Sequence, residues 1–253
     1  MPPYPTNDMA HIRDIRPSAL EIKFLLDPAI AAGVASWARA NLAPDPNGGG
    51  AWGDEYQTTS LYFDNASYDV FNRRGSFGRS KYRIRRYGEE SSAFLERKMR
   101  QPAVLAKRRT RLSCDDLEQL SAATVDPEWP GYWFHRRVAA RQLRPVCQVS
   151  YARMARGATS DGHAIRLTLD HDLRVRPAAG HEFESGDGIA AAPDVYILEL
   201  KYQGTSPALF RRLAEEFALT AQPASKYRMG LAALGKTAPV LTVPGESVQA
   251  SYA

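Results

Sequence analysis

Cysteines and long apolar runs are scarce in this sequence. Only Cys114 and Cys147 occur in 253 residues, and their spacing matches no metal-binding motif. Two distant free thiols are typical of a protein in a reducing compartment. No stretch approaches the ~20 apolar residues that a membrane-spanning helix needs, and Met1 to Asp14 lacks the apolar core of a signal peptide. We therefore expect a cytoplasmic protein that does not itself insert into a membrane.

Several familiar catalytic signatures are also missing. The sequence has no Walker A loop, no dinucleotide-binding glycine motif and no Ser, His and Asp that we can place as a triad. Its five histidines show no metal-ligand spacing, so we interpret them as surface residues. These absences leave the charged residues as the informative part of the chain.

The composition is that of a globular protein with one large domain or two small ones. Hydrophobic residues make up 44% of the chain and charged residues 24%. The formal net charge is +5 and the isoelectric point is about 9.2. This excess favours an acidic ligand, but only the distribution of the charges can indicate a site.

Five segments alternate charged residues with apolar or aromatic ones. They are Glu21–Phe24, Lys81–Arg85, Leu95–Met99, Tyr151–Met154 and Leu198–Tyr202. Successive side chains of a strand point to opposite faces, so each segment presents its charges on one face. If these strands close into a barrel with the charges inside, the lumen suits a chain of phosphates, because Arg and Lys bind phosphate well. The alternative is a solvated outer face with ordinary ion pairs, and alternation alone does not separate the two.

A few acidic residues share the alternating positions, namely Glu21, Glu96 and Glu199. A hard divalent cation prefers oxygen ligands and is often held by one or two carboxylates together with substrate phosphates. These residues therefore predict Mg²⁺ or Mn²⁺ bound with a triphosphate. Structural ion pairs with neighbouring bases are the alternative interpretation.

Helix signals accompany the predicted strands, which indicates an α+β fold. Asp27 followed by Pro28 is typical of a helix start, and that helix should run to Leu42. Ser225 and Lys226 open the last predicted helix, where Lys226 is either a phosphate contact beside free backbone N–H groups or a solvated lysine. Further helices are expected over 114–120, 131–143 and 207–219. The basic run of Lys107, Arg108 and Arg109 is either a phosphate-binding patch or a basic loop.

Nine short motifs follow one another along the chain: EIKFLL, TTSLYFDN, KYRIRRY, FLERK, KRR, SYARMA, IRLTLD, YILELKY and SKY. In this order they resemble the VTC domain, the catalytic domain of the vacuolar transporter chaperone polyphosphate polymerases. That family lies in the triphosphate tunnel metalloenzyme, or CYTH-like, superfamily. The likeness implies a closed antiparallel β-barrel tunnel flanked by helices. We expect this domain over residues 16–236, with a flexible tail at 1–15 and a second tail at 237–253.

The resemblance also implies an activity. VTC domains transfer the γ-phosphate of ATP onto a growing inorganic polyphosphate chain with a divalent metal, Mn²⁺ or Mg²⁺. The implied ligands are ATP, polyphosphate, triphosphate and pyrophosphate rather than nucleic acid, and a membrane or regulatory protein partner stays open. The alternatives are a metal-dependent triphosphatase of the same superfamily and a non-catalytic polyphosphate-binding module.

The implied site residues follow from the matching positions. The catalytic set is Lys23, Arg83, Arg85, Lys98, Arg153 and Glu199. The phosphate- or nucleotide-binding set is Lys107, Tyr151, Arg166, Lys201, Ser225 and Lys226. Glu199 is the implied metal ligand, with Glu21 and Glu96 as further candidates.

One position departs from the superfamily pattern. Its triphosphatases and cyclases begin with Glu-x-Glu-x-Lys, whereas Ala19 stands here in the place of the first Glu. Fewer carboxylates near the metal make a poorer site for activating a water molecule. The departure therefore favours phosphoryl transfer to a polymer over hydrolysis.

Overall fold

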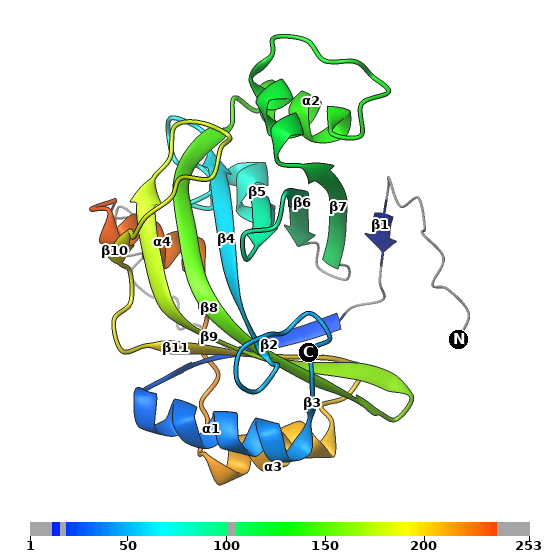
Figure 1. Cartoon of the computed structure of the whole chain (residues 1–253), viewed down its shortest axis with the longest axis vertical. Coiled ribbons are helices and arrows are strands. Elements are labelled where there is room, and N and C mark those ends of the chain that lie inside the picture. Colours follow the sequence, from blue (N-terminus) through cyan, green and yellow to red (C-terminus); the bar gives the residue numbers. More distant parts are fainter. Residues whose placement is uncertain (1–11, 16–18, 101–104, 237–253) are drawn as a thin grey trace.

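The computed structural model describes residues 12–15, 19–100 and 105–236. One strongly curved antiparallel sheet dominates it, with the strand order β1-β7-β6-β5-β4-β8-β9-β11-β2 (Figure 1). The short strands β3 and β10 extend it by pairing with β8 and β9. The strands are β1 Ile12–Ile15, β2 Ala19–Leu26, β3 Ala43–Pro44, β4 Glu55–Asp64, β5 Ser80–Tyr87, β6 Ser92–Arg100, β7 Leu105–Ser113, β8 Arg144–Ser160, β9 His163–Pro177, β10 Ile189–Ala190 and β11 Tyr196–Gln203.

Helices cover parts of the sheet, and the last of them reaches its concave side. Figure 1 shows α1 and α3 together below β2 and β11, α2 beyond the end of β7, and α4 beside β9. The helices are α1 Pro28–Asn41, α2 Tyr132–Ala140, α3 Ala208–Glu216 and α4 Lys226–Ala233, with 3-10 turns η1 Gly75–Arg79 and η2 Asp115–Ser121. None of the helices in the described ranges is both long and apolar enough to cross a bilayer.

Local sequence signals explain where two of these helices begin. The Asp27 carboxylate accepts a hydrogen bond from the Ile30 N–H at 2.9 Å, and Pro28 takes the first helical position, as expected for α1. The Ser225 hydroxyl accepts from the Arg228 N–H and caps α4 in the same way. The cap of α4 matters for function, because it fixes where Lys226 enters the interior of the sheet.

The apolar residues that alternate with the charges form two cores on the outer face of the sheet. Leu198 and Leu200 of β11 pack with Val34 of α1 in one core. Ile84 of β5 and Phe134 of α2 belong to the other. Each buried side chain of this size contributes about 1.5–3 kcal/mol. Since these residues face outward, the charged positions between them face the concave side.

The sheet does not close into a barrel within the described residues. The path ends at β1 and β2, which form no ladder with each other, so the predicted closed barrel is not confirmed. We call the gap between β2 and the flank formed by β6 and β7 the seam. Side chains bridge it: Lys98 Nζ of β6 donates to Glu21 Oε2 of β2 at 3.2 Å.

Two regions differ from the elements expected from the sequence. The basic run at Lys107 belongs to β7 and pairs with β6, so it is a strand and not a loop. Residues Ile12–Ile15, which we placed in the N-terminal tail, pair with β7 as β1. The predicted C-terminal tail, 237–253, lies outside the described residues.

Candidate functional site

Strand register gathers the predicted charges on the concave side of the sheet. Arg83 lies opposite Glu96 across β5 and β6, and Glu199 lies opposite Lys23 across β11 and β2. We call this set of side chains the charged face. Its cations are Lys23, Lys81, Arg83, Arg85, Lys98, Lys107, Arg109, Arg153, Arg166, Lys201 and Lys226, and its carboxylates are Glu21, Glu96, Asp170 and Glu199. The cations outnumber the carboxylates, so the empty face carries a net positive charge.

Glu96 is the centre of the first ion-pair cluster. It is 2% exposed and lies 2.6 Å from Arg83 Nη2, 3.0 Å from Lys107 Nζ and 3.1 Å from Arg109 Nε. Burial opposes ionisation of this carboxyl group, but the cations, with Arg83 first, hold its pKa well below the usual range. Glu96 is therefore ionised and ties three strands together.

Glu21 and Glu199 form a second cluster around two shared lysines. Lys23 Nζ lies 3.1 Å from Glu21 Oε1 and 2.9 Å from Glu199 Oε1, while Lys201 Nζ lies 3.7 Å and 3.2 Å from the two carboxylates. Burial and Glu199 oppose ionisation of Glu21, yet Lys201, Lys98 and Lys23 outweigh them and lower its pKa to about 2. Both carboxylates are consequently anionic at neutral pH.

Asp170 is the centre of a third ion-pair cluster with Arg153 and Lys226, and Lys226 connects it to Glu199 of the second cluster. Arg153 holds Asp170 with two hydrogen bonds of 2.5 and 2.7 Å, and Lys226 Nζ lies 2.5 Å from Oδ2. Lys226 also reaches Glu199 Oε1 at 3.4 Å and lies 4.8 Å from the centre of the Tyr151 ring. Burial opposes its charge, but Asp170 and Glu199 raise the pKa of Lys226 above the usual lysine value. The N-terminal residue of α4 is thus part of the charged face.

Arg85 differs from these paired residues. It is only 5% exposed, and its guanidinium donates to Ser60 Oγ at 3.1 Å and to the Tyr151 hydroxyl at 3.0 Å. No carboxylate of the described residues forms an ion pair with it. Arginine stays protonated in proteins, and Glu96, which attracts Arg85 from beyond ion-pair distance, is already paired with three other cations. A buried charge without a counterion in direct contact is costly. An anion bound beside Arg85 would compensate this charge.

Arg166 lies at the margin of the charged face. Its side chain is 42% exposed, and it contacts Asp45 Oδ2 at 2.7 Å and the Tyr56 hydroxyl at 2.9 Å. Ser225 lies at another margin, where its hydroxyl accepts from Lys81 Nζ at 3.0 Å. The site residues predicted from the sequence therefore lie on or beside the charged face, although Arg85, Arg166, Tyr151 and Ser225 are outside the three ion-pair clusters.

Three members of the charged face are absent from the catalytic, binding and metal sets that the resemblance implied, namely Lys81, Arg109 and Asp170. Arg109 belongs to the basic run noted in the sequence and shares the inward face of β7 with Lys107. Asp170 shares the inward face of β9 with Arg166, four residues earlier. Lys81 alternates with Arg83 on β5, so the same two-residue period contained the signal for it.

Among the described residues, Glu21 and Glu199 are the predicted metal ligands that lie together. No group of three or more His, Cys, Asp or Glu residues suited to a metal occurs in the described part of the chain. Glu21 and Glu199, however, lie on the same two lysines, and two carboxylates with substrate phosphates are an ordinary Mg²⁺ or Mn²⁺ ligand set. Glu96 fits less well, because no second carboxylate of the described residues shares its three cations.

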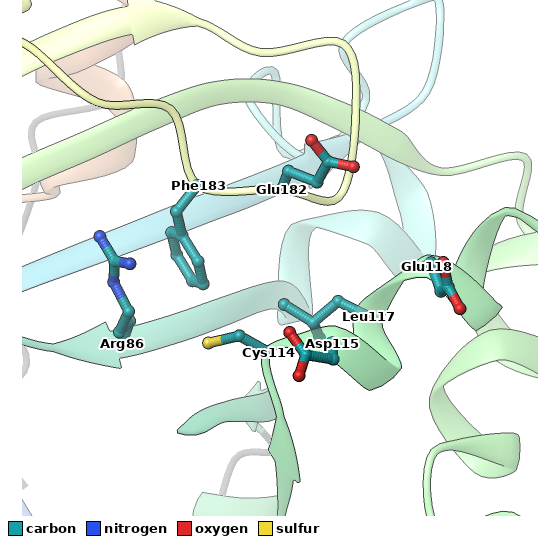
Figure 2. A pocket seen from close by; sticks show the side chains of 7 residues that line it. All are labelled: Arg86, Cys114, Asp115, Leu117, Glu118, Glu182 and Phe183. Atoms are coloured by element: carbon teal, nitrogen blue, oxygen red, sulfur yellow. The ribbon is translucent and has the colours of Figure 1, made fainter. Parts of the chain in front are cut away.

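A separate surface pocket of about 380 Å³ lies on the opposite side of the sheet (Figure 2). It is lined by Arg86, Cys114, Asp115, Leu117, Glu118, Glu182 and Phe183. Arg86 follows Arg85 on β5 and so points to the other face, where it lies over the Phe183 ring. This pocket shares no residue with the charged face.

An antiparallel sheet that lines its concave side with Lys, Arg and a few carboxylates, flanked by helices, is the architecture of the CYTH-like proteins. A candidate adenylate cyclase from Bacillus halodurans has this fold, with 17% identity, a TM-score of 0.50, and coverage of 82% of this chain and 93% of that one. The VTC domain model matches residues 18–235, and the chain belongs to the VTC domain family.

Two further solved structures show weaker similarity. One is a candidate adenylyl cyclase from Hippeastrum with a dominant triphosphatase activity, at 18% identity, TM-score 0.45, and coverage of 88% of this chain and 98% of that one. The other is the PH1819 protein from Pyrococcus horikoshii, at 11% identity, TM-score 0.47, and coverage of 87% and 100%. No curated protein matches this sequence.

Proposed function

We propose that this chain is an ATP:polyphosphate phosphotransferase that works on its charged face. The observation that carries this proposal is Arg85, a buried and permanent charge held only by hydroxyl groups, among carboxylates that are already paired with other cations. A polyanion supplies the missing negative charge at Arg85 and on the rest of the face. Membership of the VTC domain family supports polyphosphate as that polyanion.

The residues divide by their exposure. Arg85 and Arg153 are buried, and Lys226 is buried beside them, so they suit the phosphates of a fully bound triphosphate. Lys98 and Lys201 are 42% and 34% exposed, so they remain accessible to a longer chain that arrives from solvent. Arg and Lys in this arrangement position the two phosphate groups and offset the charge that builds up between them.

In the proposed reaction, a terminal phosphate oxygen of the polymer attacks the γ-phosphorus of ATP. A P–O bond forms to the polymer, the bond between the γ-phosphorus and the bridging oxygen breaks, and ADP leaves with that electron pair. The attacking oxygen is already ionised, so no protein base has to take a proton. Glu21 and Glu199 would hold the divalent cation, which supplies charge neutralisation on the phosphate oxygens.

The paired state of the carboxylates favours transfer over hydrolysis. Glu21, Glu96, Asp170 and Glu199 all lie within ion-pair distance of Lys or Arg, and their pKa values are lowered. A carboxylate that is so stabilised in its ionised form is a poor acceptor for a proton from water. Ala19, in place of a further Glu, removes one more carboxylate from this region.

Incubation with ATP and Mn²⁺ or Mg²⁺, followed by gel electrophoresis of the product, tests this proposal. The expected result is a ladder of long polyphosphate that forms as ATP is consumed. Glu199→Gln should abolish the ladder, and Arg85→Ala should weaken binding of triphosphate. Arg212→Ala is the matched control, because Arg212 is an exposed residue of α3 on the other side of the sheet.

The possible products separate the alternatives. Orthophosphate without polymer would replace the proposal by a metal-dependent triphosphatase. Binding of polyphosphate without turnover of ATP would leave a binding module. A protein that binds neither triphosphate nor polyphosphate at low salt would contradict the assignment of the charged face.

A further inference from the structure

Lys81 occupies an unusual place on the charged face. It lies directly opposite Lys98 across β5 and β6, and Lys98 lies directly opposite Lys107 across β6 and β7. Three lysines therefore form one row over three adjacent strands. Like charges directly opposite one another in a sheet destabilise it, so each lysine of the row needs compensation.

Two lysines of the row have a carboxylate and the third has none. Lys98 lies 3.2 Å from Glu21, and Lys107 lies 3.0 Å from Glu96. Lys81 contacts only the Ser225 hydroxyl among the described residues, at 3.0 Å. Ser225 is the N-cap of α4, and the N-terminus of a helix carries partial positive charge.

The charged groups that act most strongly on Lys81 are cations of the neighbouring elements. Lys23 of β2, Lys98 of β6, Arg83 of β5 and Arg73 of the loop before η1 all oppose its protonation. Burial acts first in the same direction, and together these effects lower the pKa of Lys81 to about 7. In the empty protein this lysine therefore loses much of its charge at physiological pH.

We propose that Lys81 is a further phosphate-binding residue of the charged face, and that it takes up a proton from solvent when a phosphate chain binds. The proposal rests on the proposed function, since it requires that phosphates occupy the face. On binding, the amine of Lys81 accepts one proton from water or buffer, and the resulting ammonium donates a hydrogen bond to a phosphate oxygen. The bound anion supplies the negative charge that Lys98 and Lys107 receive from Glu21 and Glu96.

This arrangement makes phosphate affinity depend on pH through one identified residue. Above the pKa of Lys81, each pH unit should weaken triphosphate binding by up to tenfold, because protonation of the amine must accompany binding. An arginine at the same position stays charged in this range and should remove that contribution. Ionisation of the phosphate changes the affinity of both proteins equally. The difference in pH dependence between wild type and Lys81→Arg therefore reports the protonation of Lys81 alone.

The test is calorimetric titration of sodium triphosphate into the full chain at pH 8, in two buffers of different ionisation enthalpy, which gives the number of protons taken up. With a pKa of about 7, the wild-type protein should take up roughly 0.9 proton more per triphosphate than Lys81→Arg. Lys81→Met should match Lys81→Arg in proton count but bind more weakly. Lys236→Met, on an exposed lysine after α4, should behave as the wild type.

The outcomes distinguish this inference from the proposed function. If wild type and Lys81→Arg bind triphosphate with equal proton uptake, the inference about Lys81 is overturned and phosphate binding stands. If Lys81→Met binds as tightly as the wild type, Lys81 is not a phosphate-binding residue. If the wild type binds no triphosphate, both fall together.

Discussion

At the scale of single residues, Glu96 shows how much of the charged face is structural. Glu96→Gln keeps the size of the side chain but leaves Arg83, Lys107 and Arg109 without their shared carboxylate. Breaking such a buried pair costs about 3–5 kcal/mol of unfolding free energy. Chemical denaturation should show this loss, and triphosphate should restore more stability to Glu96→Gln than to the wild type.

A matched control is Glu89→Gln, since Glu89 is 88% exposed and pairs only with Arg86 at the surface. Exposed pairs of this kind contribute little, so its stability should be unchanged. Equal stability of Glu96→Gln and Glu89→Gln would show that Glu96 does not hold the three strands together.

Removing the charge of Lys81 should raise the stability of the protein, in contrast to the loss expected for Glu96→Gln, because this charge lowers the unfolding free energy when no phosphate is bound. Its pKa falls from 10.5 to about 7 on folding, so the cost is fully present below pH 7 and disappears as the pH rises towards 10.5. Lys81→Met should therefore raise the melting temperature at pH 6.5 by roughly 2–4 °C for a relief of about 1 kcal/mol. The difference from the wild type should shrink at pH 9.5, and a lower melting temperature at pH 6.5 would contradict the assignment.

At the scale of elements, α4 positions Lys226 through close packing. Gly230 lies where an added Cβ would come within 3.0 Å of both Val149 and Val175. Gly230→Val should push α4 away from β8 and β9 and move Lys226 off Asp170 and Glu199. We expect a lower melting temperature and at least a tenfold weaker affinity for triphosphate, measured by calorimetry.

Ala232→Val is the control on the same helix. Ala232 is exposed, so the added methyl groups meet solvent. Its affinity for triphosphate should equal that of the wild type. If Gly230→Val also retained full affinity, the position of α4 would not determine the site.

The elements also show which parts of this structure could be predicted from the sequence. The alternation of Arg83 and Arg85 with apolar neighbours gave the correct face of β5, because the outward positions, such as Ile84, are buried and apolar. On β7 the outward position between Lys107 and Arg109 is Arg108, so the run of three basic residues shows no alternation from which a strand could be predicted. The guanidinium of Arg108 lies 4.3 Å from the centre of the Trp133 ring, so an arginine takes the place of an apolar residue in packing against α2.

The openness of the sheet could not be predicted from local patterns. Whether the edge strands β1 and β2 pair with each other depends on the twist summed over nine strands, and no single segment encodes that sum. The pairing of Glu21 with Lys98 likewise joins residues far apart in the chain. The sequence therefore predicted which charged residues line the concave side, whereas the ion pairs between them could be identified only from the folded structure.

At the scale of the whole molecule, the buried carboxylates predict sensitivity to acid. The pKa of Glu21 is about 2, and those of Glu96, Asp170 and Glu199 are also lowered by neighbouring cations. A lowered pKa contributes stability that is present above the ordinary carboxyl value of about 4 and is lost as the pH falls through the folded pKa. The unfolding free energy should stay level near neutral pH and fall steeply between about pH 4.5 and 2.

Urea denaturation at a series of pH values measures this directly. Triphosphate at a hundredfold excess over its dissociation constant should add about 2.7 kcal/mol at neutral pH. Salt should reduce that gain, because it screens the accessible cations. Unchanged stability from pH 6 to pH 3 would be incompatible with the ion pairs described here.

The seam between β2 and the flank formed by β6 and β7 also determines how a bound phosphate can affect the sheet. Main-chain ladders join the strands elsewhere, but here the two flanks meet through Lys98 and Glu21. A phosphate group that binds Lys98 in place of Glu21 replaces one counterion of this lysine by another. No main-chain hydrogen bond between strands has to break for this exchange. The ligand then fastens the two flanks in place of the protein's own carboxylate.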